Sequence, residues 1–279
     1  MGLAFVKMHG LGNDFVLIDC RTDGLPGMNM PELARRLGDR RLGIGFDQLL
    51  LLYPSACADF KMLIYNADGG EVEMCGNGIR CFAKYIWDRN LSAKDVLEVE
   101  TLAGIIKPER AGDMVKVDMG EPVLEPSRIP ANIPPSYQGR VVDYPLTVKD
   151  REFRITLVSM GNPHAVIFLE EDLAHFPLEV YGPAIERHAL FPKRTNVEFI
   201  RVKNRTGIDM RVWERGAGIT LACGTGASAA GVAAMLKGLT DRKVTVHLAK
   251  GDLLIQWAEN NHVYMTGPAE EVFEGRLRV

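Results

Sequence analysis

The chain of 279 residues lacks the features of a membrane or exported protein. No apolar run approaches the roughly 18 residues that a membrane-spanning helix needs, and the N-terminus does not combine a basic start, an apolar stretch and a small-residue cleavage site. The formal net charge is only -3, and no basic stripe indicates a nucleic-acid surface. We therefore expect a small-molecule partner, with no membrane and no nucleic-acid partner.

The chain has few cysteines, and their pattern excludes several kinds of site. Five cysteines, an odd number, do not suit a disulfide framework and favour the reducing cytoplasm. Cys75 and Cys81 are not accompanied by further ligands in a zinc-like pattern, so we expect no metal. The glycine loops have neither the Gly-Lys-Ser/Thr end of a P-loop nor the spacing of a dinucleotide fingerprint. Cys20, Cys57 and Cys81 are interpreted as small core residues.

One short motif occurs twice. Met-Cys-Gly-Asn-Gly at 74–78 returns as Ala-Cys-Gly-Thr-Gly at 222–226, so that Cys223 follows Cys75 by 148 residues, half the length of the chain. The same offset, within one residue, holds along most of each half and indicates an internal duplication. Other matched positions are Asn13 with Asn162, Gln48 with Asn196, Met62 with Met210, Tyr65 with Trp213, Gly104 with Gly251 and Gly120 with Gly267.

Short runs rich in Val, Ile and Leu dominate both halves and predict strands. The predicted strands cover 3–8, 15–19, 61–65 and 97–101 in the first half, and 153–158, 165–169, 208–213, 244–248 and 253–257 in the second. Helices are predicted at corresponding places, over 31–40 and 79–88 and over 178–187 and 227–237, the last with Gly238 as its C-cap. The sequence therefore predicts an α/β (α+β) fold with more strands than helices.

A proline-rich stretch at 121–135 interrupts this pattern and is predicted to be the linker. It divides the chain into an N-terminal repeat domain, 1–121, with Cys75, and a C-terminal repeat domain, 122–265, with Cys223. Each is large enough to bury a core of its own. We expect two pseudo-symmetric domains.

Each copy of the motif joins a thiol to the start of a helix. The glycines allow a tight turn and close approach of a ligand to the backbone. The free amides of the first turn and the positive end of the helix dipole attract a carboxylate, and the same field is expected to lower the pKa of the cysteine from about 8.5. Two such motifs facing one another would place a sulfur on each face of the carbon next to the carboxylate. That arrangement indicates a racemase or epimerase.

Such a reaction must remove the weakly acidic α-hydrogen of an amino acid. Without pyridoxal phosphate, stabilisation must come from positioning and from donors at the carboxylate, each worth roughly 2.7 to 4 kcal/mol. One thiol must be ionised while the other is protonated. The two halves differ at this point, because Glu214 replaces Asn66 and His164 replaces Phe15. We expect these ionisable groups of the second half to adjust the two thiols.

Longer motifs resemble those of the diaminopimelate epimerase family. They span the chain from near residue 5 to about 275, and the Glu-Arg-Gly run together with Cys-Gly-Asn-Gly-x-Arg-Cys separates the chain from proline racemase-like relatives. The motifs are HGLGNDF at 9–15, NADG at 66–69, MCGNGIRC at 74–81, GNPH at 161–164, TNVEF at 195–199 and ERGAGITLACGTGA at 214–227.

The resemblance implies a cofactor-independent interconversion of LL- and meso-diaminopimelate, in lysine and peptidoglycan precursor synthesis, with Cys75 and Cys223 as opposed acid and base. It also implies that His164 and Glu214 modulate the pKa values of the thiols. The implied substrate-binding residues are Gly76, Asn77, Gly224 and Thr225 at the reacting carboxylate, Glu214 at the reacting ammonium, and Asn13, Gln48, Asn66, Asn162, Asn196 and Arg215 at the distal end.

The resemblance further implies that each domain is a barrel-like sheet around a central helix, with the active site in the cleft between the domains. Residues 266–279 are expected to return to the first domain, and the family usually forms a homodimer. Phe273 stands where some members have tyrosine at the dimer contact.

Two other functions stay open. A related cofactor-independent racemase or epimerase for a different amino acid would have the same two thiols and another distal pocket. Arg215 with the asparagines favours diaminopimelate, because a second carboxylate needs a charged, bidentate partner. A non-catalytic amino-acid-binding or redox-sensing module would use the thiols as a disulfide switch and would exchange no α-hydrogen.

Overall fold

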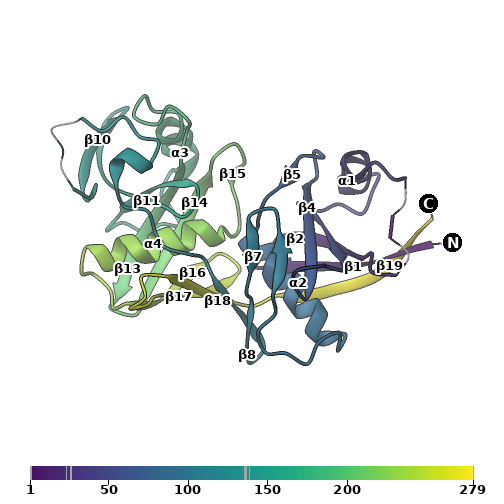
Figure 1. The fold of residues 1–279 in the computed structure, drawn as a ribbon. Coiled ribbons are helices and arrows are strands. Elements are labelled where there is room, and N and C mark those ends of the chain that lie inside the picture. The colour runs from purple at the N-terminus through teal and green to yellow at the C-terminus, as the bar shows by residue number, and fades with distance from the viewer. Residues whose placement is uncertain (1, 23, 26, 135–136, 138, 279) are drawn as a thin grey trace. The chain divides into compact units, whose positions relative to one another are not determined.

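The structure is a computed structural model, which describes residues 2–22, 24–25, 27–134, 137 and 139–278 (Figure 1). The chain folds into two compact units: unit 1 comprises Met1–Asp118 and Thr266–Val279, and unit 2 comprises Met119–Met265. Both units are rich in strands and contain few helices. Within the described part of the chain, no helix is long and apolar enough to cross a membrane.

Unit 1 is built on a mixed sheet. Its elements are β1 (Gly2–Gly10), β2 (Asn13–Asp19), α1 (Met30–Gly38), β3 (Gln48–Tyr53), β4 (Phe60–Asn66), β5 (Glu71–Val72), α2 (Gly76–Asp88), β6 (Val99–Thr101), β7 (Gly104–Ile106), β8 (Glu109–Ala111), β9 (Met114–Asp118) and β19 (Glu270–Arg278). The strand order is β19-β1-β2-β3-β4-β6-β7, and β5 pairs with β4. The C-terminal strand β19 thus lies at the sheet edge, antiparallel to β1.

Unit 2 repeats this plan. Its elements are η1 (Pro126–Arg128), β10 (Tyr144–Val148), β11 (Arg151–Ser159), β12 (Pro163–Phe168), α3 (Leu178–Glu186), β13 (Asn196–Asn204), β14 (Gly207–Glu214), β15 (Gly218–Ile219), α4 (Gly224–Leu236), β16 (Lys243–Leu248), β17 (Gly251–Trp257) and β18 (Val263–Gly267). Its strands run in the order β10-β11-β12-β13-β14-β16-β17-β18, and β15 pairs with β14.

The pairing of the strands confirms the internal duplication. Phe15 of β2 pairs with Gln48 of the parallel strand β3, and His164 of β12 pairs with Asn196 of the parallel strand β13. In both sheets an antiparallel pair, β3–β4 or β13–β14, comes next, followed by a parallel and then an antiparallel pair. Positions that the sequence offset matches therefore occupy equivalent places in the two sheets. Where the residue types at such a pair of positions differ, the two units can be compared directly.

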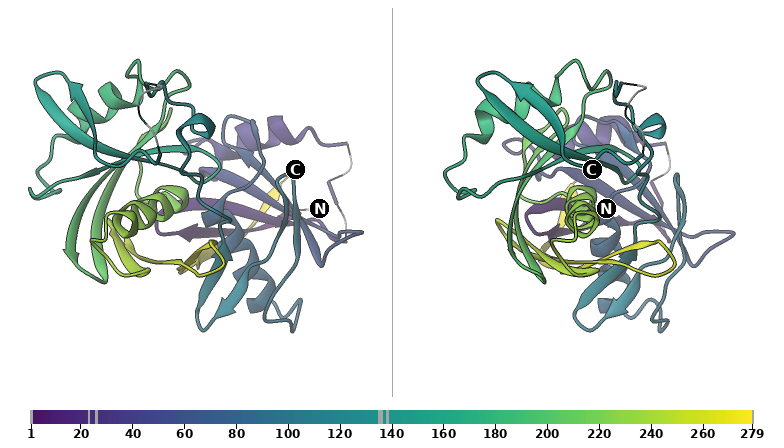
Figure 2. Two further views of the ribbon diagram at one scale, coloured as in Figure 1. Left: turned by 60° about the vertical axis from the view of Figure 1, so that its left-hand side comes forward. Right: turned by 90° about the vertical axis from the view of Figure 1, so that its left-hand side faces the viewer.

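Helix α4 is the central helix of unit 2. It contacts β11, β12, β13, β14, β16 and β17, and the end-on view in Figure 2 shows strands of its unit on several sides. Small residues allow this close packing: a Cβ on Gly231 would lie 2.8 Å from Cγ2 of Ile255. In unit 1, α2 contacts β1, β2, β3, β9 and β19. The predicted fold class, two strand-rich α/β (α+β) domains of the same design, is confirmed.

The starts of the two central helices differ from the prediction. α2 begins at Gly76 and α4 at Gly224, not at Ile79 and Ala227. Glycine is a poor helix former, so the sequence pattern places both starts too late. The correct starts make Cys75 and Cys223 the N-cap residues, with the glycines in the first helical turn.

The remaining predicted elements are present. The helices predicted over 31–40 and 178–187 are α1 and α3, and each predicted strand is found, although the one over 97–101 begins only at Val99. Helix α4 ends as expected: Gly238 has a φ of 68°, and Leu239 donates its amide to the carbonyl of Ala234.

The proline-rich stretch is packed against unit 2 over its described part and is not a free tether. Val123 forms a bridge with Ser159, and the side chain of Ile129 is buried in the core of the unit. The apolar side chains between the prolines explain this packing, because they can be buried even where proline prevents regular sheet pairing. Pro135, the last residue of the predicted linker, lies outside the described residues.

Candidate active site

Cys75 caps the first turn of α2 in unit 1. Its sulfur accepts the amide N–H of Gly78 at 3.4 Å. Oδ1 of Asn13, at the start of β2, lies 4.0 Å from the sulfur and accepts Nδ2 of Asn77 at 3.0 Å. Three predicted site residues from two separate elements thus come together around one thiol.

A charged network fixes Asn13. Its Nδ2 donates to Oδ2 of Asp47 at 2.8 Å, and Arg40 joins Asp47 to Asp14 at distances of 2.8 Å and 2.7 Å. Burial raises the pKa of Asp14, but hydrogen bonds and charge from Arg40 and Lys7 outweigh this effect and lower the pKa to about 2. Asp14 is therefore a carboxylate near neutral pH. It binds Arg40, which binds Asp47, and Asp47 accepts the hydrogen bond from Asn13.

Gln48 and Asn66 form a second polar pair in unit 1. Nε2 of Gln48, at the start of β3, donates to Oδ1 of Asn66, at the end of β4, with a distance of 2.9 Å. Their positions are opposite one another in the strand register. Oε1 of Gln48 is buried and has no hydrogen-bond partner among the described residues, which leaves an acceptor for a ligand.

Cys223 caps α4 in unit 2 and is buried. Its sulfur lies 3.6 Å from Oγ1 of Thr225. The same hydroxyl oxygen accepts Nδ2 of Asn162 at 3.3 Å. Asn162 stands in the turn between β11 and β12, at the position that matches Asn13 of unit 1, so the predicted residues again surround the thiol.

His164 is fully buried below this helix start. Its Nε2 lies 2.9 Å from Oδ1 of Asn162, and its Nδ1 lies 2.7 Å from Oε1 of Glu198 on β13. Glu198 is also fully buried and was not among the predicted site residues. The duplication contains a signal that could have found it, because Leu50 of the first half stands opposite Glu198, and a carboxylate in place of a buried leucine is unusual.

Buried polar groups also shape the turn that carries Arg215. The amide of Arg215 donates to Oδ1 of Asn196 at 2.9 Å, and Nδ2 of Asn196 donates to the carbonyl of Pro163 at 3.0 Å. Glu186 accepts Nε1 of Trp213 at 2.8 Å and the amide of Gly216 at 3.1 Å. The guanidinium of Arg215 is exposed and donates to the carbonyl of Lys193. Sequence reasoning missed Glu186, which fixes this turn from α3.

Comparison with known proteins matches the family model for diaminopimelate epimerase to residues 5–125 and 156–272. The chain belongs to the diaminopimelate epimerase family. It is 57% identical over 277 residues to the diaminopimelate epimerase of Moorella thermoacetica, with 97% of this chain and 98% of the relative covered. It is 55% identical over 276 residues to that of Pelotomaculum thermopropionicum, with 97% of each covered. The predicted family and enzyme class, an isomerase, are confirmed.

Solved structures confirm the fold of this family member. A phenazine biosynthesis protein of the PhzF family from Bacillus anthracis aligns with a TM-score of 0.71, 16% identity and coverage of 100% of both chains. A hydroxyproline epimerase from Agrobacterium vitis aligns with a TM-score of 0.67 and 13% identity, over 99% of this chain and 92% of that one. At these identities the likeness concerns the fold alone.

One electrostatic prediction for this site is wrong. Burial raises the pKa of Cys223 well above its ordinary value of 9.0, and the carboxylates of Glu214 and Glu198 raise it further. Hydrogen bonds from Thr225 and from the amide of Gly226 act in the opposite direction but are outweighed. The helix start lowers the pKa of this thiol only in part, because loss of hydration and two nearby carboxyl groups outweigh it.

Glu214 lies at the end of β14 and accepts a hydrogen bond from the Thr220 hydroxyl. Burial raises its pKa above the ordinary value of 4.5. Hydrogen bonds from Thr220 and Cys223 oppose this rise, the charge of Glu198 adds to it, and His164 reduces it. Glu214, Cys223, Glu198 and His164 thus form one electrostatically linked group in unit 2.

Two predicted residues fall outside these constellations. Phe273 is 47% exposed on β19 and packs edge-to-face on Phe5, with ring centroids 6.0 Å apart. Cys57 is exposed beside Ser55 and Glu100, so its interpretation as a core residue is wrong, whereas Cys20 and Cys81 are buried. The loop before β4 places Cys57 at the surface, which residue type alone does not reveal.

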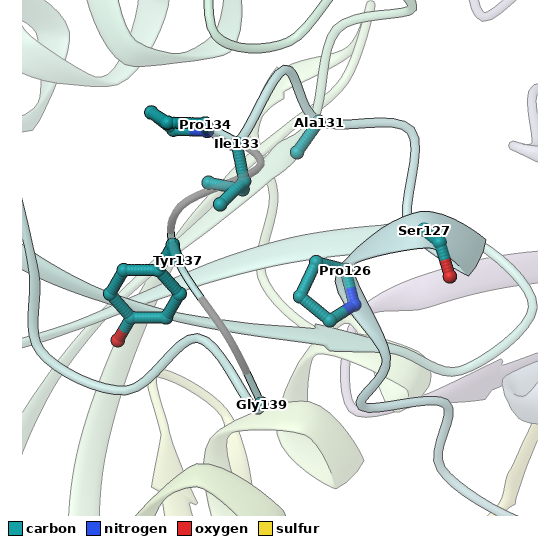
Figure 3. A pocket seen from close by; sticks show the side chains of 7 residues that line it. All are labelled: Pro126, Ser127, Ala131, Ile133, Pro134, Tyr137 and Gly139. Atoms are coloured by element: carbon teal, nitrogen blue, oxygen red, sulfur yellow. The ribbon is translucent and has the colours of Figure 1, made fainter.

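Unit 2 also contains a cavity of about 290 Å³ away from Cys223. Figure 3 shows its lining, which consists mostly of apolar and small side chains from the proline-rich stretch and from the residues just after it, among them Pro126, Ile133 and Tyr137. None of its described lining residues has a charged side chain that could bind an amino acid. Among the described residues, no three His, Cys, Asp or Glu side chains are grouped so that they could hold a metal ion.

Proposed function

We propose that this protein interconverts LL- and meso-diaminopimelate without a cofactor, and that Cys75 and Cys223 are its two bases. Membership of the diaminopimelate epimerase family supports the reaction and the substrate. One observation supports the assignment of the thiols: each is the N-cap of the central helix in its own copy of the duplicated unit. The two thiols are thus equivalent in the fold.

In this reaction one cysteine, as thiolate, removes the α-hydrogen as a proton, and the electron pair of the broken C–H bond passes into the adjacent carboxylate. The other cysteine, as thiol, then donates its proton to the opposite face of the carbon. The roles are exchanged in the reverse direction. This route requires both thiols to reach one carbon from opposite faces, and it leaves the substrate inverted at that carbon.

The developing negative charge needs donors that are already in place. The amides of Gly76, Asn77, Gly224 and Thr225 belong to the first turns of α2 and α4, at the positive ends of the helix dipoles, which attract anions. We assign the reacting carboxylate to these amides. Each donor of this type contributes roughly 2.7 to 4 kcal/mol to transition-state stabilisation.

The remaining polar residues suit the two amino groups and the distal carboxylate. Glu214 offers a carboxylate to the reacting ammonium group, and the exposed guanidinium of Arg215 offers a bidentate partner to the distal carboxylate. Asn196 already uses its side chain on the backbone of Arg215 and Pro163, so its part is to hold this arginine in place. The proposed polar contacts at the distal end are Asn13, Gln48, Asn66 and Asn162.

A cytoplasmic homodimer is part of the same proposal. The odd number of cysteines favours a reducing compartment. The edge strand β19 presents Val272 and Phe273, which are 54% and 47% exposed, and an exposed apolar edge is a typical surface for pairing between chains.

The function is tested by incubating the purified, reduced protein with LL-diaminopimelate in deuterated water, without added pyridoxal phosphate and with a chelator present. Formation of meso-diaminopimelate that carries deuterium at the α-carbon is expected. No deuterium in any amino acid tested would contradict an epimerase. Labelling of another amino acid but not of diaminopimelate would contradict the substrate and favour the related racemase.

A further inference from the structure

A continuous chain of hydrogen bonds joins Glu198 to the sulfur of Cys223. Oε1 of Glu198 lies 2.7 Å from Nδ1 of His164, and Nε2 of His164 lies 2.9 Å from Oδ1 of Asn162. Nδ2 of Asn162 lies 3.3 Å from Oγ1 of Thr225, which lies 3.6 Å from Sγ of Cys223. All five residues belong to unit 2, and the first two are fully buried.

The donors in this chain all point toward the sulfur. Asn162 gives an N–H to Thr225, so its Oδ1 faces His164 and accepts a hydrogen bond that the N–H of Nε2 donates. The oxygen of Thr225 already accepts from Asn162, which leaves its own O–H to donate. The atom next to it is Sγ of Cys223. A thiolate is the better acceptor for this hydroxyl, because charge-assisted hydrogen bonds are the stronger ones.

The same reasoning fixes the protonation of the buried pair. Because Nε2 of His164 carries a proton, an ionised Glu198 facing an unprotonated Nδ1 would place two lone pairs 2.7 Å apart. The contact therefore contains one further proton, on His164 or on Glu198, and the pair has no net charge. Oε2 of Glu198 is buried without a partner among the described residues, which agrees with a carboxyl group that shares a proton and is not a bare anion.

Apolar side chains take the equivalent place in the described part of unit 1. Phe15 and Leu50 stand where unit 2 has His164 and Glu198, and both are fully buried and apolar. Gly78 packs on these two side chains as Gly226 packs on Glu198. Around Cys75 the structure instead shows the oxygen of Asn13 at 4.0 Å and the amide N–H of Gly78, which the sulfur accepts at 3.4 Å.

Packing stability does not explain the polar pair. Replacing a buried ion pair with apolar groups of similar volume is often neutral or stabilising, and unit 1 demonstrates that this position accepts apolar side chains in the same fold. The position of His164 and Glu198 points instead to an electrostatic effect on Cys223. Cys223 is buried and faces the carboxylate of Glu214 from β14, which disfavours a thiolate. An ionised Glu198 on β13 would disfavour it further, whereas the proton that Glu198 shares with His164 on the neighbouring strand β12 removes that charge.

We propose that Glu198 is a positioning residue that acts through His164 and Asn162 to hold the Thr225 hydroxyl as a donor to the sulfur of Cys223. The chain thereby gives a thiolate at Cys223 a donor that offsets part of the effect of burial and of Glu214. This inference rests on the proposed function, because it takes Cys223 as one of the two bases. It adds Glu198 to the residues on which the reaction depends.

The test compares four variants in the full-length protein. Glu198→Leu and His164→Phe install the residues of unit 1, singly and together, and Glu198→Gln keeps a side chain that can donate to Nδ1 of His164. Alkylation of Cys223 by iodoacetamide is followed over a pH series by mass spectrometry of each cysteine. Cys75, in the other unit, is the internal control, and thermal unfolding checks the fold.

We expect Glu198→Leu to lower the ratio of Cys223 to Cys75 alkylation at pH 8 by about tenfold, the size of one charge-assisted hydrogen bond, and to move the alkylation profile of Cys223 to higher pH. Glu198→Gln should retain most of the wild-type ratio. The double variant should match Glu198→Leu, because both residues act through one chain.

Two results would overturn the inference. A profile that moves to lower pH in Glu198→Leu would mean that Glu198 acts as a simple negative charge on the thiol. An unchanged ratio in a folded Glu198→Leu variant would mean that the pair is structural only. Alkylation does not depend on turnover, so either result is separate from a failure of the wild-type protein to exchange the α-hydrogen of diaminopimelate.

Discussion

Gly226 lies directly against Glu198. A Cβ on Gly226 would be 2.7 Å from Oε1 of Glu198, too close unless something moves, and 3.2 Å from Sγ of Cys223, a tight contact. The absence of a side chain at this position thus lets the first turn of α4 approach both the thiol and the buried carboxyl group. The matching Gly78 of unit 1 has a milder contact, 3.2 Å from Cδ2 of Leu50.

Because the Cβ contacts at Gly226 and Gly78 differ, substitution by alanine should affect the two positions unequally. Gly226→Ala should lower kcat by about tenfold or more, because a displaced helix start misplaces the thiol and the carboxylate donors. Gly78→Ala should cost much less activity, since a leucine methyl group can move aside and alanine favours a helix. Steady-state kinetics of both variants, with their unfolding temperatures, provide the comparison. Equal losses in both would contradict the part assigned to Glu198.

The raised pKa of Glu214 predicts a pH dependence of stability. Burial is its main cause, and the folded protein therefore retains the proton of Glu214 at pH values where the unfolded chain, with a pKa near 4.5, has lost it. This group stabilises the fold fully below pH 4.5, and its contribution is lost as the pH rises through the folded-state pKa. A Gln side chain does not ionise, so Glu214→Gln should remove this decline.

Urea unfolding of the wild type and of Glu214→Gln at pH 4 and at pH 7 measures the effect. The variant should gain stability relative to the wild type between the two pH values, while its activity falls because the substrate ammonium loses its counter-charge. A wild type that gains stability relative to the variant over the same interval would show that the carboxylate, not the acid, is the favoured form in the fold.

Charge on the edge strand β19 should weaken the proposed dimer. Phe273→Arg places a cation on an exposed apolar edge, and sedimentation velocity should show a shift toward monomer. Leu102→Arg is the matched control, because Leu102 is 52% exposed in the turn between β6 and β7 of the same unit. If both variants sediment as the wild type does, β19 is not the contact surface.

Much of the fold could be predicted because the duplication provides an internal comparison. The offset between Cys75 and Cys223 predicts which strands correspond, and the pairing of Phe15 with Gln48 and of His164 with Asn196 confirms it. Helix starts were less predictable. The glycines after each cysteine are poor helix formers, and only their packing on the sheet shows that they form the first turn.

The sequence predicts which residues form the candidate site, but it does not predict their pKa values as well. Residue types and spacing identify both thiols, but the pKa of Cys223 depends on burial and on the carboxyl groups of Glu214 and Glu198, which the fold brings to the thiol. Glu198 illustrates the same difficulty. A glutamate in a strand normally faces solvent. The matching Leu50 of the first half is a signal that this one is buried, but the strand register is needed to show that it lies under the central helix.

The central claim is that two thiols, one from each unit, perform the inversion. The most direct measurement is deuterium incorporation at the α-carbon of LL- and meso-diaminopimelate in deuterated water by the wild type, Cys75→Ala and Cys223→Ala. Our account predicts labelled, inverted product with the wild type, and no inversion by either folded variant from either substrate. A single variant that still inverts diaminopimelate at the wild-type rate would contradict it.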